Sequence, residues 1–479
     1  MTFPLPNANP VWPHFQALCA IPRPSKHESR LRDHLCSWAR ARELHHEVDA
    51  AGNLLIRKAA SPGKENCPGV ALQGHLDMVC QQNEGTGHDF HRDPIRPVIE
   101  DGWLVARDTT LGADNGIGVA LALAVLDSRE LRHGPLEVLF TVDEEAGMGG
   151  ARGLAPGWLQ SAMLINLDTE EWGSFYLGAA GGVDVVASRG YAEEAIPAGH
   201  EVLRLSVSGL VGGHSGGDIH LERGNAIKLL ARVLERLGHD WRLARLQGGT
   251  ARNALPREAW AVVSLPAAAI STVRADIAAI ETEFREELAG VDGGVTVRLE
   301  PDCADQVLVA ADQATLLNLL RALPHGVHRM SRRVEGVVET SNNLGVARLA
   351  EGRFDATLMV RSLLASGTTA LSGQIVSILK LAGASAELRG AYPGWAPDPD
   401  SRLLTLMREV YRREFAAEPE IRVIHAGLEC GLLATKYPHL QMVSYGPDIR
   451  GAHAPGERVE IASVDRCWQL LTATLAAIS

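Results

Sequence analysis

Four short apolar runs, each followed closely by a polar or acidic residue, constrain the fold of this chain more than any other feature. They are residues 70–72 before His75, 136–142 before Glu144 and Glu145, 162–167 before Asp168, and 441–445 before a loop that holds His453. Apolar runs of this length, separated by helical segments, are typical of buried and largely parallel strands. Functional groups collect at the carboxyl ends of such strands. We therefore predict an α/β fold in which a mostly parallel-sheet domain carries a functional site along one edge.

The middle of the chain follows a different pattern. A strand is predicted over residues 200–207 and an amphipathic helix over 221–237, and a second strand and helix are predicted over 354–361 and 369–382. No strict sequence repeat relates the two pairs. We nevertheless expect this α+β region to hold two similar halves.

The position of His453 determines the predicted domain organisation. If this histidine joins ligands from the first part of the chain, the middle must be an insertion into one catalytic domain. At 479 residues the chain is also too long for a single compact core. We predict a catalytic, metal-binding domain formed by residues 1–182 and 394–479, and an inserted α+β lid domain over residues 183–393.

Composition and charge argue against several classes of protein. The 46 basic and 58 acidic residues give a net charge of −12, which disfavours a nucleic-acid or anionic-membrane partner because both require a basic face. We expect neither a secretory signal nor a membrane span, since the N-terminal residues lack a basic region before an apolar core and no apolar stretch approaches about 18 residues. Seven scattered cysteines, an odd number, argue against a disulfide framework. These features predict a cytoplasmic protein.

The polar residues at the predicted strand ends are of the types that a hydrolytic zinc site requires. Imidazole and carboxylate groups hold zinc in hydrolases, with one position left open to water. His75 and Asp77 face the same side of an extended segment, so Asp77 can orient the ring of His75. Glu144 and Glu145 are adjacent and point in different directions, so one can bind metal while the other acts as a general base.

Each of these features has an ordinary explanation when it is taken alone. A His-x-Asp pair or a Glu-Glu pair is more often solvated surface, and Asp168 could cap the next helix. Asp114 lies in a glycine-rich turn that opens a predicted helix at Gly118. The order of all four features along the chain favours the metal site. The chain contains no His-Glu-x-x-His motif, so a helix-borne zinc site is excluded.

Seven longer motifs extend these features along nearly the whole chain. They are residues 74–79, 110–118, 143–150, 166–171, 212–220, 425–431 and 446–453. Together they resemble the bacterial aminoacyl-histidine dipeptidase family, also called the Xaa-His or cytosol non-specific dipeptidases, which belongs to the co-catalytic zinc exopeptidases. The motifs are long and keep a fixed order, so a chance match is improbable.

The resemblance implies a site for two divalent metal ions, expected to be Zn²⁺, with Co²⁺ or Mn²⁺ able to substitute. The implied ligands are His75 and Asp168 for one ion, Glu145 and His453 for the other, and Asp114 as the bridge between them. Glu144 would be the general base that takes a proton from water and returns it to the leaving amine. Asp77 would be the partner that orients His75.

The resemblance also assigns roles to residues of the inserted region. His214 would stabilise the tetrahedral oxyanion, in relatives often from the partner subunit. Without the resemblance, an ordinary turn histidine is the simpler interpretation of this residue. Asn253 and Arg361 match substrate-binding positions, and Arg361 suits a bidentate contact with the terminal carboxylate of a dipeptide. The region would act as a lid that closes on the metal domain and would supply the interface of a homodimer.

A pocket for the substrate's ammonium group is a further hypothesis. We assign Glu429 to hold that group, with His425 and Gly427 lining the pocket.

The activity that the resemblance implies is hydrolysis of unblocked dipeptides, including Xaa-His dipeptides such as β-alanyl-histidine (carnosine). The alternative is an amidohydrolase of the same clan, an aminoacylase or deacylase, which acts on N-acyl amino acids and needs no ammonium pocket. A third interpretation is a metal-binding scaffold without catalysis. The presence of Glu144 and of all five implied ligands argues against it.

Overall fold

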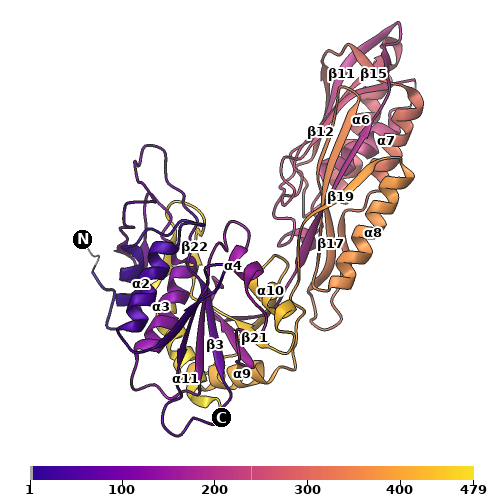
Figure 1. Ribbon diagram of the computed structural model, residues 1–479. Coiled ribbons are helices and arrows are strands. Elements are labelled where there is room, and N and C mark those ends of the chain that lie inside the picture. Colours follow the sequence, from indigo (N-terminus) through magenta and orange to yellow (C-terminus); the bar gives the residue numbers. More distant parts are fainter. Residues whose placement is uncertain (1–3, 239) are drawn as a thin grey trace. The chain divides into compact units, whose positions relative to one another are not determined.

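The computed structural model of this protein describes residues 4–238 and 240–479, so the first three residues of the stretch considered for a secretory signal lie outside it. The chain forms two compact units (Figure 1). Unit 1 comprises Met1–Gly178, Pro397–Val423 and Glu429–Ser479, and unit 2 comprises Ala179–Ala396 and Ile424–Leu428. The junctions fall after residues 178 and 396, where the sequence places boundaries after residues 182 and 393. The return of residues 424–428 to unit 2 has no counterpart in the sequence-based prediction.

Unit 1 is built on an eight-stranded sheet with the strand order β1-β2-β6-β3-β7-β21-β8-β20. The strands are β1 (His45–Val48), β2 (Leu54–Lys58), β3 (Val70–His75), β6 (Leu136–Thr141), β7 (Met163–Asn166), β8 (Ser174–Ala179), β20 (Glu420–Ile424) and β21 (Gln441–Ser444). A separate four-stranded sheet of unit 1 has the strand order β22-β23-β5-β4 and consists of β4 (Val98–Glu100), β5 (Trp103–Val105), β22 (Ile449–Arg450) and β23 (Arg458–Glu460).

The four apolar runs form the centre of the large sheet. Strands β6, β3, β7 and β21 are neighbours and pair in parallel, so their carboxyl ends meet at one edge. This arrangement confirms the predicted α/β fold with a parallel sheet. The outer strands β1, β2 and β8 pair antiparallel to their neighbours. This reversal was not predicted, because the direction of a strand is set by long-range pairing and not by its local sequence.

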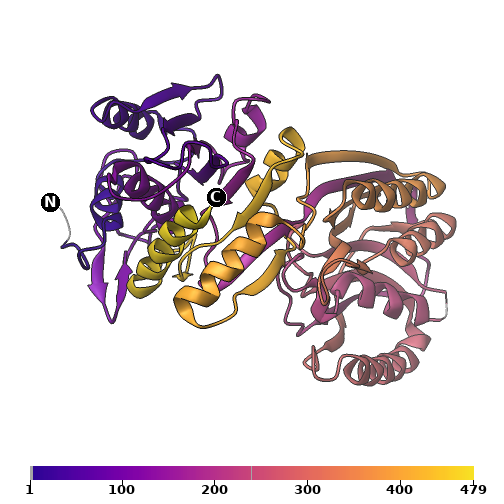
Figure 2. The same ribbon diagram turned by 90° about the horizontal axis from the view of Figure 1, so that it is seen from below.

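Seven helices are described in unit 1. They are α1 (Val11–Cys19), α2 (Ser29–Arg40), α3 (Ala113–Asp127), α4 (Gly149–Gly153), α9 (Arg402–Phe415), α10 (Glu429–Lys436) and α11 (Ile461–Ala477). The helices α9 and α11 lie side by side (Figure 2). No helix among the described residues is long and apolar enough to span a membrane.

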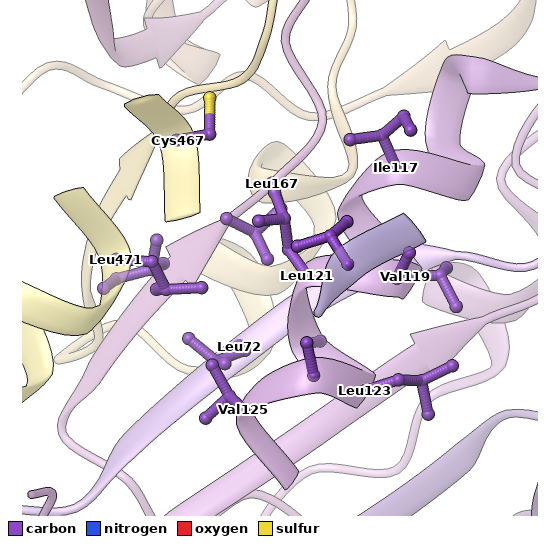
Figure 3. Packing of buried hydrophobic residues seen from close by; sticks show 14 of the residues in the cluster. Leu72, Ile117, Val119, Leu121, Leu123, Val125, Leu167, Cys467 and Leu471 are labelled. Atoms are coloured by element: carbon purple, nitrogen blue, oxygen red, sulfur yellow. The ribbon is translucent and has the colours of Figure 1, made fainter. Parts of the chain in front are cut away.

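Helix α3 is buried on every side. Its residues from Gly116 to Leu126 are all buried, because the helix packs against β3, α1 and α11 at once. A helix that is apolar all round requires such an environment. Figure 3 shows Leu121 and Leu123 of α3 among Leu72 of β3 and Leu471 of α11. The N-terminus of α3, which carries Asp114, is thereby fixed beside the carboxyl ends of the parallel strands.

Unit 2 contains a nine-stranded antiparallel sheet with helices packed on it. The main strands are β9 (Gly181–Gly190), β11 (His200–Ser208), β12 (Arg242–Gly248), β13 (Ala259–Pro266), β14 (Thr296–Pro301), β16 (Gly326–Met330), β17 (Val338–Ala350), β18 (Arg353–Ser362) and β19 (Ser385–Tyr392), with a separate pair β10 (Glu193–Ala195) and β15 (Gln306–Leu308). The helices are α5 (Ala226–Arg236), α6 (Ile270–Glu287), α7 (Ala310–Ala322) and α8 (Ala365–Leu381), with short 3₁₀ turns at Ile219–Leu221 and Ala267–Ala269.

The sheet of unit 2 consists of two halves with the same topology. The first half runs β11-α5-β12-β13-α6-β14 and the second runs β9-α7-β17-β18-α8-β19, and each has the strand order of a ferredoxin-like βαββαβ motif. The halves join where β12 pairs with β17. The first half is inserted between β9 and α7 of the second, which explains why the similarity is hidden in the sequence.

The burial of α3 makes a prediction about stability. Leu121→Ala removes a fully buried side chain and should lower the free energy of unfolding of unit 1 by about 2–5 kcal/mol, measured by chemical unfolding followed by circular dichroism. Leu381→Ala is the control, because Leu381 is 90% exposed. A loss below about 1 kcal/mol for Leu121→Ala, equal to that of the control, would contradict the packing described for α3.

Candidate active site

The end of strand β3 places the first two predicted residues, His75 in the strand and Asp77 two residues beyond it. His75 is the last residue of β3 and is buried, and its Nδ1 atom lies 3.4 Å from Oδ1 of Asp77. Asp77 also accepts hydrogen bonds from the backbone N–H groups of Glu144 (3.0 Å) and Glu145 (3.1 Å) and from the hydroxyl of Ser25 (2.8 Å). Although burial opposes ionisation, the interactions with His75 and these hydrogen bonds lower the pKa of Asp77 below its usual value. Asp77 therefore fixes both the His75 ring and the backbone that carries the two glutamates.

The five predicted metal ligands come together around the carboxylate of Asp114. His75 Nε2 lies 3.1 Å from Asp114 Oδ1 and 3.3 Å from Asp168 Oδ1. His453 Nε2 lies 3.2 Å from Asp114 Oδ2 and 3.1 Å from Glu145 Oε1. Each oxygen of Asp114 thus faces a different histidine. The groups His75–Asp114–Asp168 and Asp114–Glu145–His453 each offer ligand atoms that lie within 4.8 Å of one another.

These distances fit a metal ion better than hydrogen bonds alone. A neutral imidazole Nε2 carries at most one proton, yet each of the two Nε2 atoms faces two carboxylate oxygens. Zinc bonds of about 2.0–2.1 Å at tetrahedral angles separate two ligand atoms by about 3.3 Å, close to the spacing observed here. Asp168 Oδ1 is buried and accepts no hydrogen bond from any described residue. A cation between the ligands would satisfy all of these atoms.

The electrostatics of the cluster lead to the same conclusion. Burial opposes the charge of His75, but Asp168, Asp114 and Asp77 outweigh it and raise the pKa of His75 well above its usual value. Hydrogen bonds to Asp114 and Glu145 raise the pKa of His453 to about 11, and burial raises the pKa of Asp168 to about 7. In the absence of metal the cluster therefore holds protons near neutral pH, and a divalent cation would displace them.

Glu144 lies next to this cluster. Burial raises the pKa of its carboxyl well above the usual value; the charge of His75 opposes this, and the nearby Asp168 and Glu429 reinforce it. Glu144 also forms a group with His75 and Glu145 whose ligand atoms lie within 4.8 Å of one another. A carboxyl with a raised pKa beside a metal centre suits proton transfer at neutral pH.

The other predicted residues belong to unit 2. His214 lies in the loop after β11, and its Nδ1 accepts hydrogen bonds from the backbone N–H groups of Gly216 (3.3 Å) and Gly217 (3.0 Å). The ring proton therefore resides on Nε2, which leaves Nε2–H as a donor. Burial, and after it the charge of Arg361, lower the pKa of His214. His214 is thus a neutral hydrogen-bond donor at neutral pH.

Arg361 is a largely buried cation at the end of β18. Its Nη1 donates to the hydroxyl of Tyr392 at 2.8 Å, and its Nε atom is buried without a hydrogen-bond partner among the described residues. Burial lowers the pKa of Arg361, while Tyr392 and Asp184 oppose that effect. The arginine therefore retains donor capacity for an anionic group.

Asn253 and His425 contact the loop that carries His214. The backbone carbonyl of Asn253 accepts a hydrogen bond from Ser215 N at 2.8 Å. A Cβ atom on Gly216 would lie only 2.0 Å from the carbonyl oxygen of His425, so this loop requires glycine where it meets residues 424–428. Gly427 belongs to the same short segment. Within unit 2, Arg361 lies close enough to His214 and His425 to lower the pKa of both, whereas Asn253 contacts the His214 loop through its backbone carbonyl.

Comparison with known proteins identifies the family. The sequence profile of peptidase family M20/M25/M40 matches residues 71–477. The chain belongs to this peptidase family.

Relatives of this peptidase match it over nearly their full length. The cytosol non-specific dipeptidase of Escherichia coli (strain K12) is 47% identical over 474 residues, which cover 98% of this chain and 97% of that protein. The crystal structure of aminoacylhistidine dipeptidase from Vibrio alginolyticus shares 46% sequence identity and a TM-score of 0.94, covering 99% of this chain and 97% of that one. A tripeptidase from Staphylococcus aureus, 15% identical with a TM-score of 0.57 and 98% of both chains covered, shares the fold. The resemblance and the peptide-hydrolase activity expected from the sequence are confirmed.

The predicted residue Glu429 belongs to a network of buried polar side chains whose other members, Gln73, Thr141, Asn166 and Ser444, sequence reasoning missed. Glu429 has no exposed surface, and its Oε2 accepts hydrogen bonds from Gln73 (2.7 Å) and Thr141 (2.6 Å). Asn166 donates in turn to Gln73, and Ser444 donates to Asn166. Thr141, Gln73, Asn166 and Ser444 thus form a row across the carboxyl-terminal ends of the four parallel strands, with Gln73 two residues before the candidate ligand His75. A polar residue such as Gln73 inside an apolar run was the available signal.

Because Gln73 and Thr141 occupy Oε2 of Glu429, only its other carboxyl oxygen is free for the predicted contact with an ammonium group. Burial raises the pKa of Glu429 to about 7. Its Oε1 has no hydrogen-bond partner among the described residues and is therefore the oxygen left for an ammonium group. Glu429 lies in unit 1, whereas His425 and Gly427 lie in unit 2.

The environment of His425 predicts a pH dependence of stability. Burial, reinforced by Arg361 and His214, lowers the pKa of His425 to about 3. Its stabilising contribution is therefore present above the unfolded pKa of about 6.5 and is lost as the pH falls. Between pH 7.5 and pH 5.0 the wild type should lose on the order of 2 kcal/mol more unfolding free energy than His425→Gln does. Equal pH slopes for the two proteins in chemical unfolding, with His328→Gln as the exposed control, would contradict the neutral buried imidazole.

Proposed function

We propose that this peptidase hydrolyses the peptide bond of unblocked dipeptides, including Xaa-His dipeptides such as carnosine, with two divalent metal ions. The observation that carries the proposal is the carboxylate of Asp114, whose two oxygens lie 3.1 Å and 3.2 Å from the Nε2 atoms of His75 and His453. The substrate class is supported by the dipeptidases of E. coli and V. alginolyticus, which match this chain at 47% and 46% identity over nearly its whole length.

The proposed metal ligands divide into two sets that share one residue. His75 and Asp168 would hold one ion, Glu145 and His453 the other, and Asp114 would bridge them. Zn²⁺ suits a donor set of imidazole and carboxylate, and Co²⁺ or Mn²⁺ would be able to replace it. When bound, the ions would lower the pKa of a water molecule and polarise the substrate carbonyl. Asp77 would keep the Nε2 atom of His75 directed toward the site.

Glu144 is the proposed general base. It would take a proton from the attacking water and return it to the amine that leaves when the peptide bond breaks. Its raised pKa supports both steps, because the carboxyl has to accept a proton and hold it until the amine departs.

Unit 2 is the proposed lid and source of substrate contacts. The Nε2–H group of His214 would donate to the developing oxyanion, and Arg361 would bind the terminal carboxylate of the dipeptide together with Asn253. The Oε1 atom of Glu429 would accept from the substrate's ammonium group, in a pocket lined by His425 and Gly427. An unblocked substrate presents both charges that these groups recognise.

Location and assembly complete the proposal. A cytoplasmic location is supported by the seven free cysteines and by the name of the E. coli relative, a cytosol dipeptidase. We also propose a homodimer formed through unit 2.

Metal removal tests the mechanism. Treatment with EDTA should abolish hydrolysis of carnosine and other unblocked dipeptides, and Zn²⁺, Co²⁺ or Mn²⁺ should restore it, because the proposed ions would lower the pKa of the attacking water and polarise the substrate carbonyl. Activity that survives thorough chelation would refute the proposal. Faster hydrolysis of N-acetyl amino acids than of free dipeptides by the restored enzyme would favour the amidohydrolase alternative.

Replacement of the base separates catalysis from metal binding. Glu144→Gln should retain two metal ions per chain, measured by elemental analysis, and lower kcat by about 10²–10⁴-fold because the amide cannot accept the proton. Glu130→Gln, at an exposed position, should leave kcat unchanged. Near-normal turnover in Glu144→Gln would reassign the general base.

A further inference from the structure

Glu457 is a buried carboxylate that the proposed reaction does not use. It follows His453 by four residues and is 2% exposed. Its two oxygens accept four backbone hydrogen bonds. Oε2 accepts from Leu111 N (2.7 Å) and Gly112 N (2.9 Å), and Oε1 accepts from Ala113 N (2.8 Å) and Asp114 N (3.3 Å). No other described carboxylate receives four backbone N–H groups from one continuous loop.

The four donors belong to the loop that places Asp114. They include the first N–H groups of α3, which have no partner within the helix. A carboxylate at this position is favoured by charge-assisted hydrogen bonds. The carboxylate comes from a segment more than 340 residues further along the chain. Glu457 therefore ties the loop of Asp114 to the loop of His453.

Arg23 holds the same loop from the opposite side. Its Nη2 donates to the carbonyl of Gly112 (2.5 Å), and its Nη1 donates to the carbonyls of Leu76 (2.9 Å) and Asp77 (2.8 Å). Gly112 thus donates to Glu457 and accepts from Arg23. A Cβ atom at Gly112 would lie 2.5 Å from Arg23 Nη2 and 2.8 Å from the sulfur of Met78, so a side chain cannot enter.

The backbone of Glu457 is itself held in place. Its carbonyl accepts a hydrogen bond from Ala106 N at 3.1 Å, and its N–H donates to the carbonyl of Ala454 at 3.2 Å. The next residue, Arg458, begins β23 and pairs with Val105 of β5. The carboxylate therefore projects from a segment that is held by the four-stranded sheet of unit 1. Its hydrogen bonds can thus keep the loop of Asp114 in a fixed position relative to that sheet.

We propose that Glu457 is a positioning residue for the metal centre, which fixes the separation of Asp114 and His453 while Arg23 fixes the separation of Asp114 and His75. The proposal rests on the proposed metal site. The loops that carry His75, Asp114 and His453 lie far apart in the sequence. Two buried side chains of opposite charge, Glu457 and Arg23, would hold them in one fixed arrangement. Loss of the Glu457 carboxylate should leave every ligand present and weaken the binding of the ions.

The test is the metal affinity of Glu457→Gln. The amide has nearly the same size, but it replaces one acceptor oxygen by an NH₂ group that faces two backbone N–H donors. Zn²⁺ affinity, measured by competition with a chromophoric chelator, should fall by about 10–100-fold, and the visible spectrum of the Co²⁺ form should change. Glu460→Gln is the matched control, because Glu460 lies in β23 and its carboxylate accepts from Arg466 without contacting the ligand loops. Its metal affinity should remain that of the wild type.

The outcomes separate this proposal from the proposed function. If the wild type binds two ions and Glu457→Gln binds them equally tightly with an unchanged Co²⁺ spectrum, the positioning role is overturned while the metal site stands. If the wild type binds no metal, the proposed function itself fails. Circular dichroism of the metal-free variant establishes folding. Should Glu457→Gln not fold, Glu457→Asp is measured in its place, and affinity equal to that of the wild type would overturn the proposal.

Discussion

The carboxylate of Asp114 is the point on which the arrangement of unit 1 depends. Its two oxygens face His75, at the end of a central strand, and His453, 339 residues away from Asp114 in the sequence. For both contacts to form, the parallel sheet, the buried helix α3 and the C-terminal loop must all be in place. Helix α3 provides this precision because it is packed on every side and cannot move without opening the core.

Charge imposes the next constraint. Asp114, Glu144, Glu145 and Asp168 bring four carboxyl groups together with only two histidines, and burial of so much like charge is unfavourable without cations. The raised pKa values of Asp168 and Glu144 show how the metal-free protein responds, by retaining protons. Two divalent ions would replace those protons and make the same cluster reactive toward water.

The parallel sheet and the position of the site were predictable from the sequence. The apolar runs indicate buried parallel strands, and the acidic residues that follow them indicate the edge where the strands' carboxyl ends meet. The fourth apolar run indicated that the loop of His453 leaves the same edge, but the role of His453 as a metal ligand came only from the resemblance. The two similar halves of unit 2 were expected from its strand and helix pattern. The antiparallel edge strands, the insertion of one half of unit 2 between β9 and α7 of the other, and the return of residues 424–428 to unit 2 depend on long-range pairing that local sequence does not encode. Glu457, Arg23 and the row from Thr141 to Ser444 were missed for a different reason. Their partners are backbone groups or buried amides, and a single polar residue in an apolar segment does not reveal which partner it meets.

The central claim is that Asp114 bridges two metal ions, and anomalous diffraction from crystals of the zinc-loaded protein tests it most directly. An anomalous difference map recorded at the zinc absorption edge should show two peaks about 3.5–4 Å apart, one beside His75 and Asp168 and the other beside Glu145 and His453, with an oxygen of Asp114 bound to each. A single peak, or peaks away from Asp114 at full zinc occupancy, would contradict the account.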